Sequence, residues 1–110
     1  MIKDPEELKD FIVEILNEKK AESIRPMKLS GEIPICDYMI FASGRSSKNV
    51  TSIAEAVAHE VKHKAERQFS LEGKGSEWVL LDIGDVIVHI LHPKTREHFK
   101  IDEHWEKASE

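Results

Sequence analysis

Apolar residues at helical spacing mark a first segment near the start of the chain. The run Asp4-Pro5-Glu6-Glu7 combines a capping acid, a proline suited to the first helical position and a glutamate at capping-box spacing. The pattern predicts an amphipathic helix that ends near Lys19 or Lys20, where cations suit the helix dipole. Its apolar stripe, which we expect to dock on a core, is Leu8, Phe11, Ile12, Ile15 and Leu16.

A second helical pattern begins after Ser46 or Ser47, either of which can cap it, and is predicted to run to about Gln68. Because its apolar residues fall on one side, this helix also needs a surface to cover. These residues are Val50, Ile53, Ala54, Val57, Val61 and Ala65.

Runs of β-branched and aromatic residues predict the strands. Asp37–Ala42 is one strand, and Trp78–Leu81 and Val86–Leu91 form a hairpin around the polar turn Asp82–Asp85. Ile24, Met27 and Leu29 suggest a further short strand.

Weaker signals complete the pattern of strands and turns. Pro26 lacks a backbone donor, so the strand that contains it must lie at an edge or be broken there. Phe69–Leu71 is a candidate short strand, and Ser30–Pro34 and Glu72–Ser76 read as turns.

The C-terminal residues predict short helical turns. His92-Pro93 stops the last strand, Lys94–Lys100 forms a helical turn, and Asp102 is expected to cap another that docks Trp105 on the body. The order of elements indicates one α/β (α+β) domain over residues 1–110, with a small mixed β-sheet, two main helices and a short C-terminal helix.

The hairpin has apolar residues on both of its faces. Val86–Leu91 does not alternate, and such a strand is covered on both sides, either by the protein's own helices or by another molecule. Alternation in the preceding strand separates two sets of side chains. One set is Trp78, Leu80 and Asp82, and the other is Val79, Leu81 and Ile83; the pattern does not say which set faces the helices.

Composition narrows the class of partner. The chain has 21 acidic and 16 basic residues, a net charge of −5, and therefore lacks the basic surface that a primary nucleic-acid site needs. No apolar run approaches the roughly 18 to 20 residues of a membrane span, and the N-terminus has no signal-peptide core. With a single cysteine, Cys36, and no membrane segment, we expect a cytoplasmic protein.

The run His59-Glu60-Val61-Lys62-His63 matches the H-E-x-x-H pattern of zinc proteases. At about 100° per residue, however, both histidines point away from the apolar side of the helix, toward solvent. A catalytic zinc needs a third ligand and a shielded pocket. We therefore expect no functional metal site, and at most adventitious binding by this histidine pair.

The other candidate sites, a phosphate-binding loop and a carboxylate pair, lack residues that their chemistry requires. Ser43–Lys48 lacks the glycines of a phosphate-binding loop, and turn geometry accounts for Asp82 and Asp85 better than a metal-binding pair does. His89 and His92 should face opposite sides of the strand. We expect no enzyme and no cofactor; the alternative is a nucleotidyltransferase-like enzyme or nucleotide-binding protein that uses the Ser43-Gly44 turn with Asp82 or Asp85.

Three stretches together resemble the ribosomal silencing factor family, also called Iojap-like proteins. Asp37–Ser47 is similar to the family's D-Y-hydrophobic-hydrophobic-A-S-G-x-S-S signature. Glu77–His89 is similar to its E-W-hydrophobic-L-hydrophobic-D-x-G-D-V-hydrophobic-V-H core. The ending resembles P-x-x-R-x-x-aromatic and a final tryptophan, on Pro93, Arg96, Glu97, Phe99 and Trp105.

The resemblance implies a nucleotidyltransferase-like fold without catalytic function. It also implies binding to the large ribosomal subunit through ribosomal protein number fourteen, which blocks subunit joining and represses translation when nutrients are scarce. The expected contacts are centred on Trp78, for which a simple core position is the alternative. The full candidate set is Trp78, Leu80 or Leu81, Asp82, Asp85 and His89. A further candidate is a homodimer in which the apolar face of the hairpin pairs with a second copy of the chain.

Overall fold

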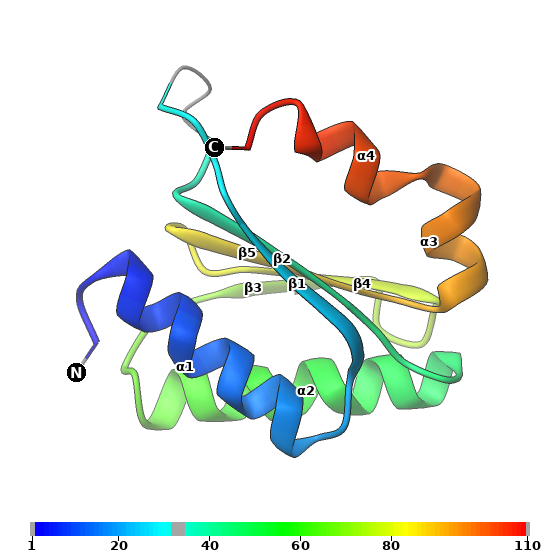
Figure 1. Cartoon of the computed structure of the whole chain (residues 1–110). Helices are drawn as coiled ribbons and strands as arrows, with labels where there is room; N and C mark the ends of the chain where they lie inside the picture. The colour runs from blue at the N-terminus through cyan, green and yellow to red at the C-terminus, as the bar shows by residue number, and fades with distance from the viewer. Residues whose placement is uncertain (1, 32–34, 110) are drawn as a thin grey trace.

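Within the residues that the computed structural model describes, 2–31 and 35–109, five strands form one mixed sheet (Figure 1). Its order is β1-β2-β5-β4-β3; β2 and β5 pair in parallel, and the other neighbours pair antiparallel. The predicted mixed sheet and its hairpin are confirmed. The predicted Ser30–Pro34 turn lies partly outside the described residues. The strands are β1 (Glu22–Lys28), β2 (Tyr38–Ser43), β3 (Ser70–Glu72), β4 (Trp78–Asp82) and β5 (Val86–Leu91).

The helices lie on both sides of this sheet. Figure 1 shows α1 (Pro5–Glu18) and α2 (Ser47–His63) along one face, with α3 (Pro93–Phe99) and α4 (Ile101–Glu106) on the opposite side. Both long helices begin where their caps predict: Asp4 Oδ1 accepts a hydrogen bond from the Glu6 N–H at 3.0 Å. Ser46 Oγ accepts one from the Asn49 N–H at 3.0 Å. The α/β (α+β) class and the two main helices are as expected, and the C-terminal residues form two short helices where one was predicted.

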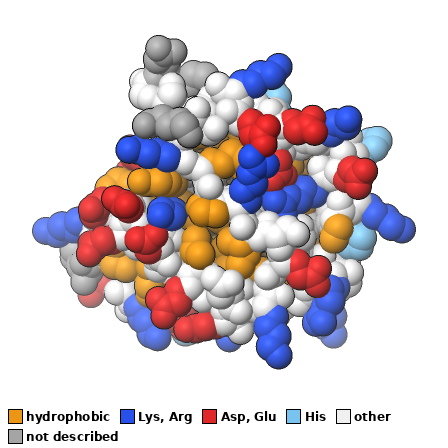
Figure 2. Space-filling view, viewed as in Figure 1, with side chains coloured by type: hydrophobic (Ala, Val, Ile, Leu, Met, Phe, Trp, Pro, Cys, Tyr) orange, Lys and Arg blue, Asp and Glu red, His pale blue; other side chains and the backbone are white. Residues whose placement is uncertain are grey.

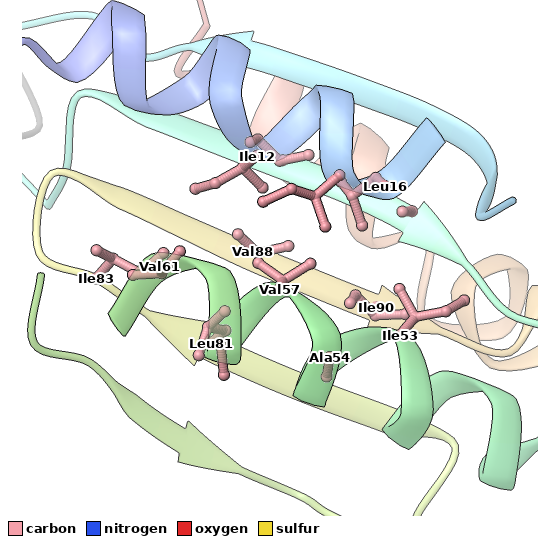
Figure 3. Close-up of a cluster of buried hydrophobic side chains, with 14 of the residues drawn as sticks. Ile12, Leu16, Ile53, Ala54, Val57, Val61, Leu81, Ile83, Val88 and Ile90 are labelled. Atoms are coloured by element: carbon pink, nitrogen blue, oxygen red, sulfur yellow. The ribbon is translucent and has the colours of Figure 1, made fainter. Parts of the chain in front are cut away.

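The main core lies between the sheet and the two long helices (Figure 3). Ile12 from α1 and Val57 from α2 are fully buried, and they meet Val88 from the central strand β5. Each fully buried aliphatic side chain of this size contributes roughly 1.5–3 kcal/mol. This contact between the helices and the sheet is therefore the largest stabilising element of the fold.

The second helix ends at His63, about five residues before the predicted Gln68. Ala65 is buried as the helical spacing predicted, but Glu66 adopts φ 53°, which turns the chain out of the helix. Arg67 then donates from Nη2 to Asp85 Oδ2 at 2.7 Å. The predicted helix end was wrong: with Glu66 in the left-handed region, the Arg67 N–H donates back to the Val61 carbonyl at 3.2 Å, which closes the helix although the apolar spacing continues to Ala65.

The first strand occupies the sheet edge that Pro26 requires. It pairs with β2 alone, and a bulge between Glu22 and Arg25 places Ser23 at φ 49°. Since an edge strand has one row of backbone groups without a ladder partner, the missing N–H of Pro26 costs no sheet hydrogen bond there.

The predicted cap of α4 is wrong. The residue at the cap position is Lys100, in the left-handed region at φ 49°, and Asp102 instead binds Arg96. Trp105 is half-buried and packs on the sheet side, as expected. In the described part of the chain, no helix has the length and apolar character that crossing a membrane demands.

Candidate functional site

The fold decides which side of the hairpin faces the helices. Val79 and Leu81 are fully buried against α1 and α2, whereas Trp78, Leu80 and Asp82 point the other way and are partly exposed. The alternating pattern in the sequence did not say which of these two sets faces the helices, and the structure does. The partly exposed set therefore forms the candidate site.

The register extends this surface onto the edge strand. Ser70 pairs with Asp82 and Glu72 pairs with Leu80, and directly paired residues lie on the same side of a sheet. Both β3 side chains are exposed. We call this surface the open face and define it as Ser70, Glu72, Trp78, Leu80 and Asp82.

The rest of the same sheet side is covered by α3, α4 and the residues after them. A smaller apolar cluster fills this space, and the half-buried Trp78 and Leu80 pack against its margin. The apolar side chains of the open face are therefore in contact with a buried apolar cluster and extend it to the protein surface. The buried members of the cluster are Met27, Leu29, Met39, Phe41, Ile87, Leu91 and Ala108.

Two neighbouring side chains contact the Trp78 ring. Its indole Nε1–H donates to Nδ1 of His89, 3.1 Å away. Its ring centroid lies 5.5 Å from that of Phe99, which is 56% exposed at the end of α3. A large aromatic side chain that is hydrogen-bonded at one edge and partly exposed has the properties of a protein-binding anchor.

Acidic groups flank the apolar centre of the open face. Asp82 accepts a hydrogen bond from the Gly84 N–H through Oδ1 at 2.8 Å, as turn chemistry predicted, and Glu72 is exposed beside Leu80. Carboxylates around an aromatic and aliphatic centre favour a partner with a basic surface.

Three of the sequence candidates do not lie on this surface. Leu81 is fully buried against the helices, so of the pair Leu80 or Leu81 only Leu80 is accessible. His89 is 5% exposed and lies behind Trp78. Asp85 binds Arg67 beyond the turn, away from Trp78.

Sequence reasoning missed Ser70 and Glu72 of the open face, and Phe99 beside it. Pairing Phe69–Leu71 with the hairpin would have found Glu72, because the register puts it opposite Leu80. Phe99 could not be found in this way, since its contact with Trp78 depends on how α3 packs across the sheet.

The nucleotide-binding alternative lacks support at the Ser43-Gly44 turn. Asn49 Oδ1 accepts a hydrogen bond from the Arg45 N–H at 2.9 Å, and Ser46 caps the helix. A Cβ at Gly44 would lie 2.9 Å from Val50 Cγ2, so glycine allows close packing here rather than space for phosphate.

The histidine pair on α2 is exposed, as predicted. The rings of His59 and His63 have centroids 4.4 Å apart. Between residues 2–31 and 35–109, no cluster of three or more His, Cys, Asp or Glu side chains is placed to hold a metal ion.

Burial of His89 predicts a specific pH dependence of stability. Desolvation lowers the pKa of His89 from 6.5 to about 4. Between those pH values the unfolded chain binds a proton that the native protein does not, so the free energy of unfolding should rise with pH, by about 3 kcal/mol across the window. Denaturant unfolding of wild-type and His89→Phe proteins from pH 3.5 to 7.5 measures this; identical pH dependence in both would contradict it.

Comparison with known proteins gives a consistent result. A family model described as "Ribosomal silencing factor during starvation" matches residues 2–110. The chain is 37% identical over 103 residues to "Ribosomal silencing factor RsfS" of Zymomonas mobilis, covering 93% of this chain and 77% of that protein. The crystal structure of a Chromobacterium violaceum protein, 31% identical, superposes with a TM-score of 0.88 and covers 94% of this chain and 88% of its own.

A more distant relative comes from an organelle. The mouse protein named "Mitochondrial assembly of ribosomal large subunit protein 1" is 25% identical over 100 residues, which is 87% of this chain and 44% of the mouse protein.

Proposed function

The chain belongs to the ribosomal silencing factor family, and we propose that it binds the large ribosomal subunit through ribosomal protein number fourteen. Bound there, it occupies the face that meets the small subunit, prevents subunit joining and lowers translation during starvation. Its relatives are named as silencing factors rather than as enzymes. This activity takes place in the cytoplasm, where subunits join.

The observation that supports this proposal is the open face. Trp78 and Leu80 continue the buried cluster under α3 and α4 to the surface, where they are partly exposed. When a partner covers such side chains, the complex is stabilised by about 25 cal/mol for each Å² of apolar surface removed from water. The mouse relative's name supports the large subunit as the partner.

Steric blocking requires only that the protein stay bound while its bulk fills the inter-subunit space. The described chain has principal extents of 33 × 32 × 21 Å, with Trp78 on one side and the α1 and α2 layer on the other. A body of that thickness held on the joining face keeps two subunit surfaces apart. No chemical step is needed for repression.

Co-sedimentation with purified subunits tests the proposal. We expect the protein to sediment with large subunits, not with small ones, and to reduce the fraction of joined ribosomes in proportion to the large subunits occupied. Binding to neither subunit would remove the proposed function. Calorimetry with nucleoside triphosphates and magnesium tests the nucleotide-binding alternative, and our proposal predicts no heat of binding.

The acidic border of the open face should make binding depend on salt. Asp82→Asn keeps the acceptor for Gly84 and removes the charge. Combined with Glu72→Gln, it should weaken binding at low salt by about fivefold, since each exposed charge contributes roughly 0.5 kcal/mol. The difference should shrink above roughly 0.5 M salt, where charges are screened.

The matched control for this charge removal is Glu14→Gln with Glu18→Gln on α1, where both side chains are exposed on the helical side of the molecule. It makes the same change in net charge. Sedimentation binding as a function of salt compares the two double variants. Equal losses would show that net charge, and not the open face, controls association.

A second copy of the chain is the rival occupant of the open face. If two copies pair there, light scattering should show a dimer at high protein concentration, and adding large subunits should dissociate it because both uses need Trp78. A dimer that persists on the large subunit would place the self-contact elsewhere.

A further inference from the structure

His89 lies directly behind the aromatic centre of the open face. It is on the central strand β5, paired with Leu80 of β4, and only 5% of its surface is exposed. Its Nδ1 accepts the hydrogen bond of the Trp78 indole. An imidazole nitrogen accepts only through its lone pair, so the ring is neutral and carries its proton on Nε2.

The imidazole is itself held from the interior. Its ring stacks on Phe41 of the neighbouring strand β2, with centroids 5.0 Å apart and an interplanar angle of 17°. Phe41 is fully buried, so it provides a fixed base for the stack. A chain of contacts therefore runs from the core through Phe41 and His89 to Trp78.

The outer side of Trp78 provides no comparable constraint. Phe99 contacts it at 5.5 Å but is 56% exposed, on a seven-residue helix that has no buried residue of its own. A ring that is packed only on that side could rotate about its side-chain bonds toward solvent. The hydrogen bond to Nδ1 selects one ring orientation, and binding is strengthened when the bound conformation already exists in the free protein.

We propose that His89 is the positioning residue of the partner-binding face: its Nδ1 holds the Trp78 indole in the orientation that the large subunit binds. This inference rests on the proposed function and deepens it, because it assigns His89 a role without direct contact. It also gives a reason for a buried polar side chain in an otherwise apolar strand.

Two substitutions separate the acceptor from the packing. His89→Phe keeps a ring against Phe41 and removes the acceptor, whereas His89→Asn places an amide oxygen near the position of Nδ1. We expect His89→Phe to weaken large-subunit binding by about fivefold, the effect of one neutral hydrogen bond. His89→Asn should stay within about twofold of wild type, which would be rescue by the acceptor alone.

The NMR signal of the Trp78 indole N–H reports on the hydrogen bond to His89 and does not respond to a change in overall stability. In a ¹⁵N–¹H spectrum, with Trp105→Phe used for assignment, the Trp78 indole signal should shift in His89→Phe and remain hydrogen-bonded in His89→Asn. Val57→Ala, which weakens the core from the opposite side of the sheet, is the matched control. It should lower stability and leave both the indole signal and the binding unchanged.

The outcomes distinguish the two levels of the proposal. Wild-type protein that fails to bind large subunits removes the proposed function, and with it the positioning role. Wild-type binding that His89→Phe leaves unchanged, or that His89→Asn loses as strongly as His89→Phe, overturns only the role of His89.

Discussion

Replacing Trp78 with alanine should weaken binding to the large subunit by 30-fold or more, the loss of about 2 kcal/mol that truncation of an aromatic anchor causes. Trp78 is partly exposed on the open face, where its ring is hydrogen-bonded to His89 and contacts Phe99. Its removal therefore takes away the largest apolar contact that the face can offer. Sedimentation binding at a series of subunit concentrations measures the change in affinity.

The control is another truncated aromatic side chain of similar burial. Phe11 on α1 is half-buried and packs against the main core, on the side of the sheet that faces away from Trp78. Phe11→Ala should bind within about twofold of wild type if both variants remain folded, because an anchor acts locally. A folded Trp78→Ala protein with wild-type affinity would show that the anchor is elsewhere.

Replacing Arg96 with alanine should have the largest effect on stability outside the main core. The Nε and Nη2 atoms of Arg96 bind the two Asp102 oxygens at 2.8 and 2.6 Å, and Nη1 donates to the Ser23 carbonyl and to Ser43 Oγ. One side chain thereby joins α3 and α4 to β1 and β2. Figure 2 shows basic and acidic side chains packed beside one another over this part of the molecule.

We expect Arg96→Ala to lower the free energy of unfolding by about 3 kcal/mol, since it leaves a largely buried carboxylate without its main partner. Arg96 holds the pKa of Asp102 below its ordinary value of 3.8, and the Asp102 side chain is only 17% exposed. Denaturant unfolding measures the global loss. Hydrogen exchange over residues 93–109 measures whether α3 and α4 open first.

Arg25 provides the comparison for Arg96. It forms ion pairs with Glu106 and, at 3.7 Å, with Asp102, but its side chain is 44% exposed. Exposed pairs of this kind contribute about 1 kcal/mol or less, so Arg25→Ala should be much milder. An Arg96→Ala protein as stable as Arg25→Ala, with unchanged exchange over α3 and α4, would mean that apolar packing alone holds these helices.

The regular elements were predictable because their residue patterns are local. Helical spacing located α1 and α2, β-branched runs located β2 and the hairpin, and Pro26 indicated an edge strand. The three stretches that resemble the silencing factors were sufficient to predict the family. These features depend on neighbours within a few residues, and the tertiary contacts of the folded chain do not change them.

The remaining features depend on contacts between distant segments. Apolar spacing continues through Ala65, so it could not reveal that Glu66 turns the chain toward Asp85. Asp102 follows the pattern of a cap, yet a guanidinium six residues earlier binds it. Sequence alternation likewise separated Leu80 from Leu81 without showing which of them is exposed, because that depends on which side of the sheet α1 and α2 cover.

Photo-crosslinking identifies what the open face touches on the large subunit. A photo-crosslinking residue, p-benzoylphenylalanine, placed at position 72 on β3 lies beside Leu80, and the same residue at position 14 on α1 is the control. Irradiated with purified large subunits, the protein labelled at position 72 should crosslink to ribosomal protein number fourteen, and the protein labelled at position 14 should not. Crosslinking to that protein from position 14 alone would show that the helical side, and not the open face, binds the subunit.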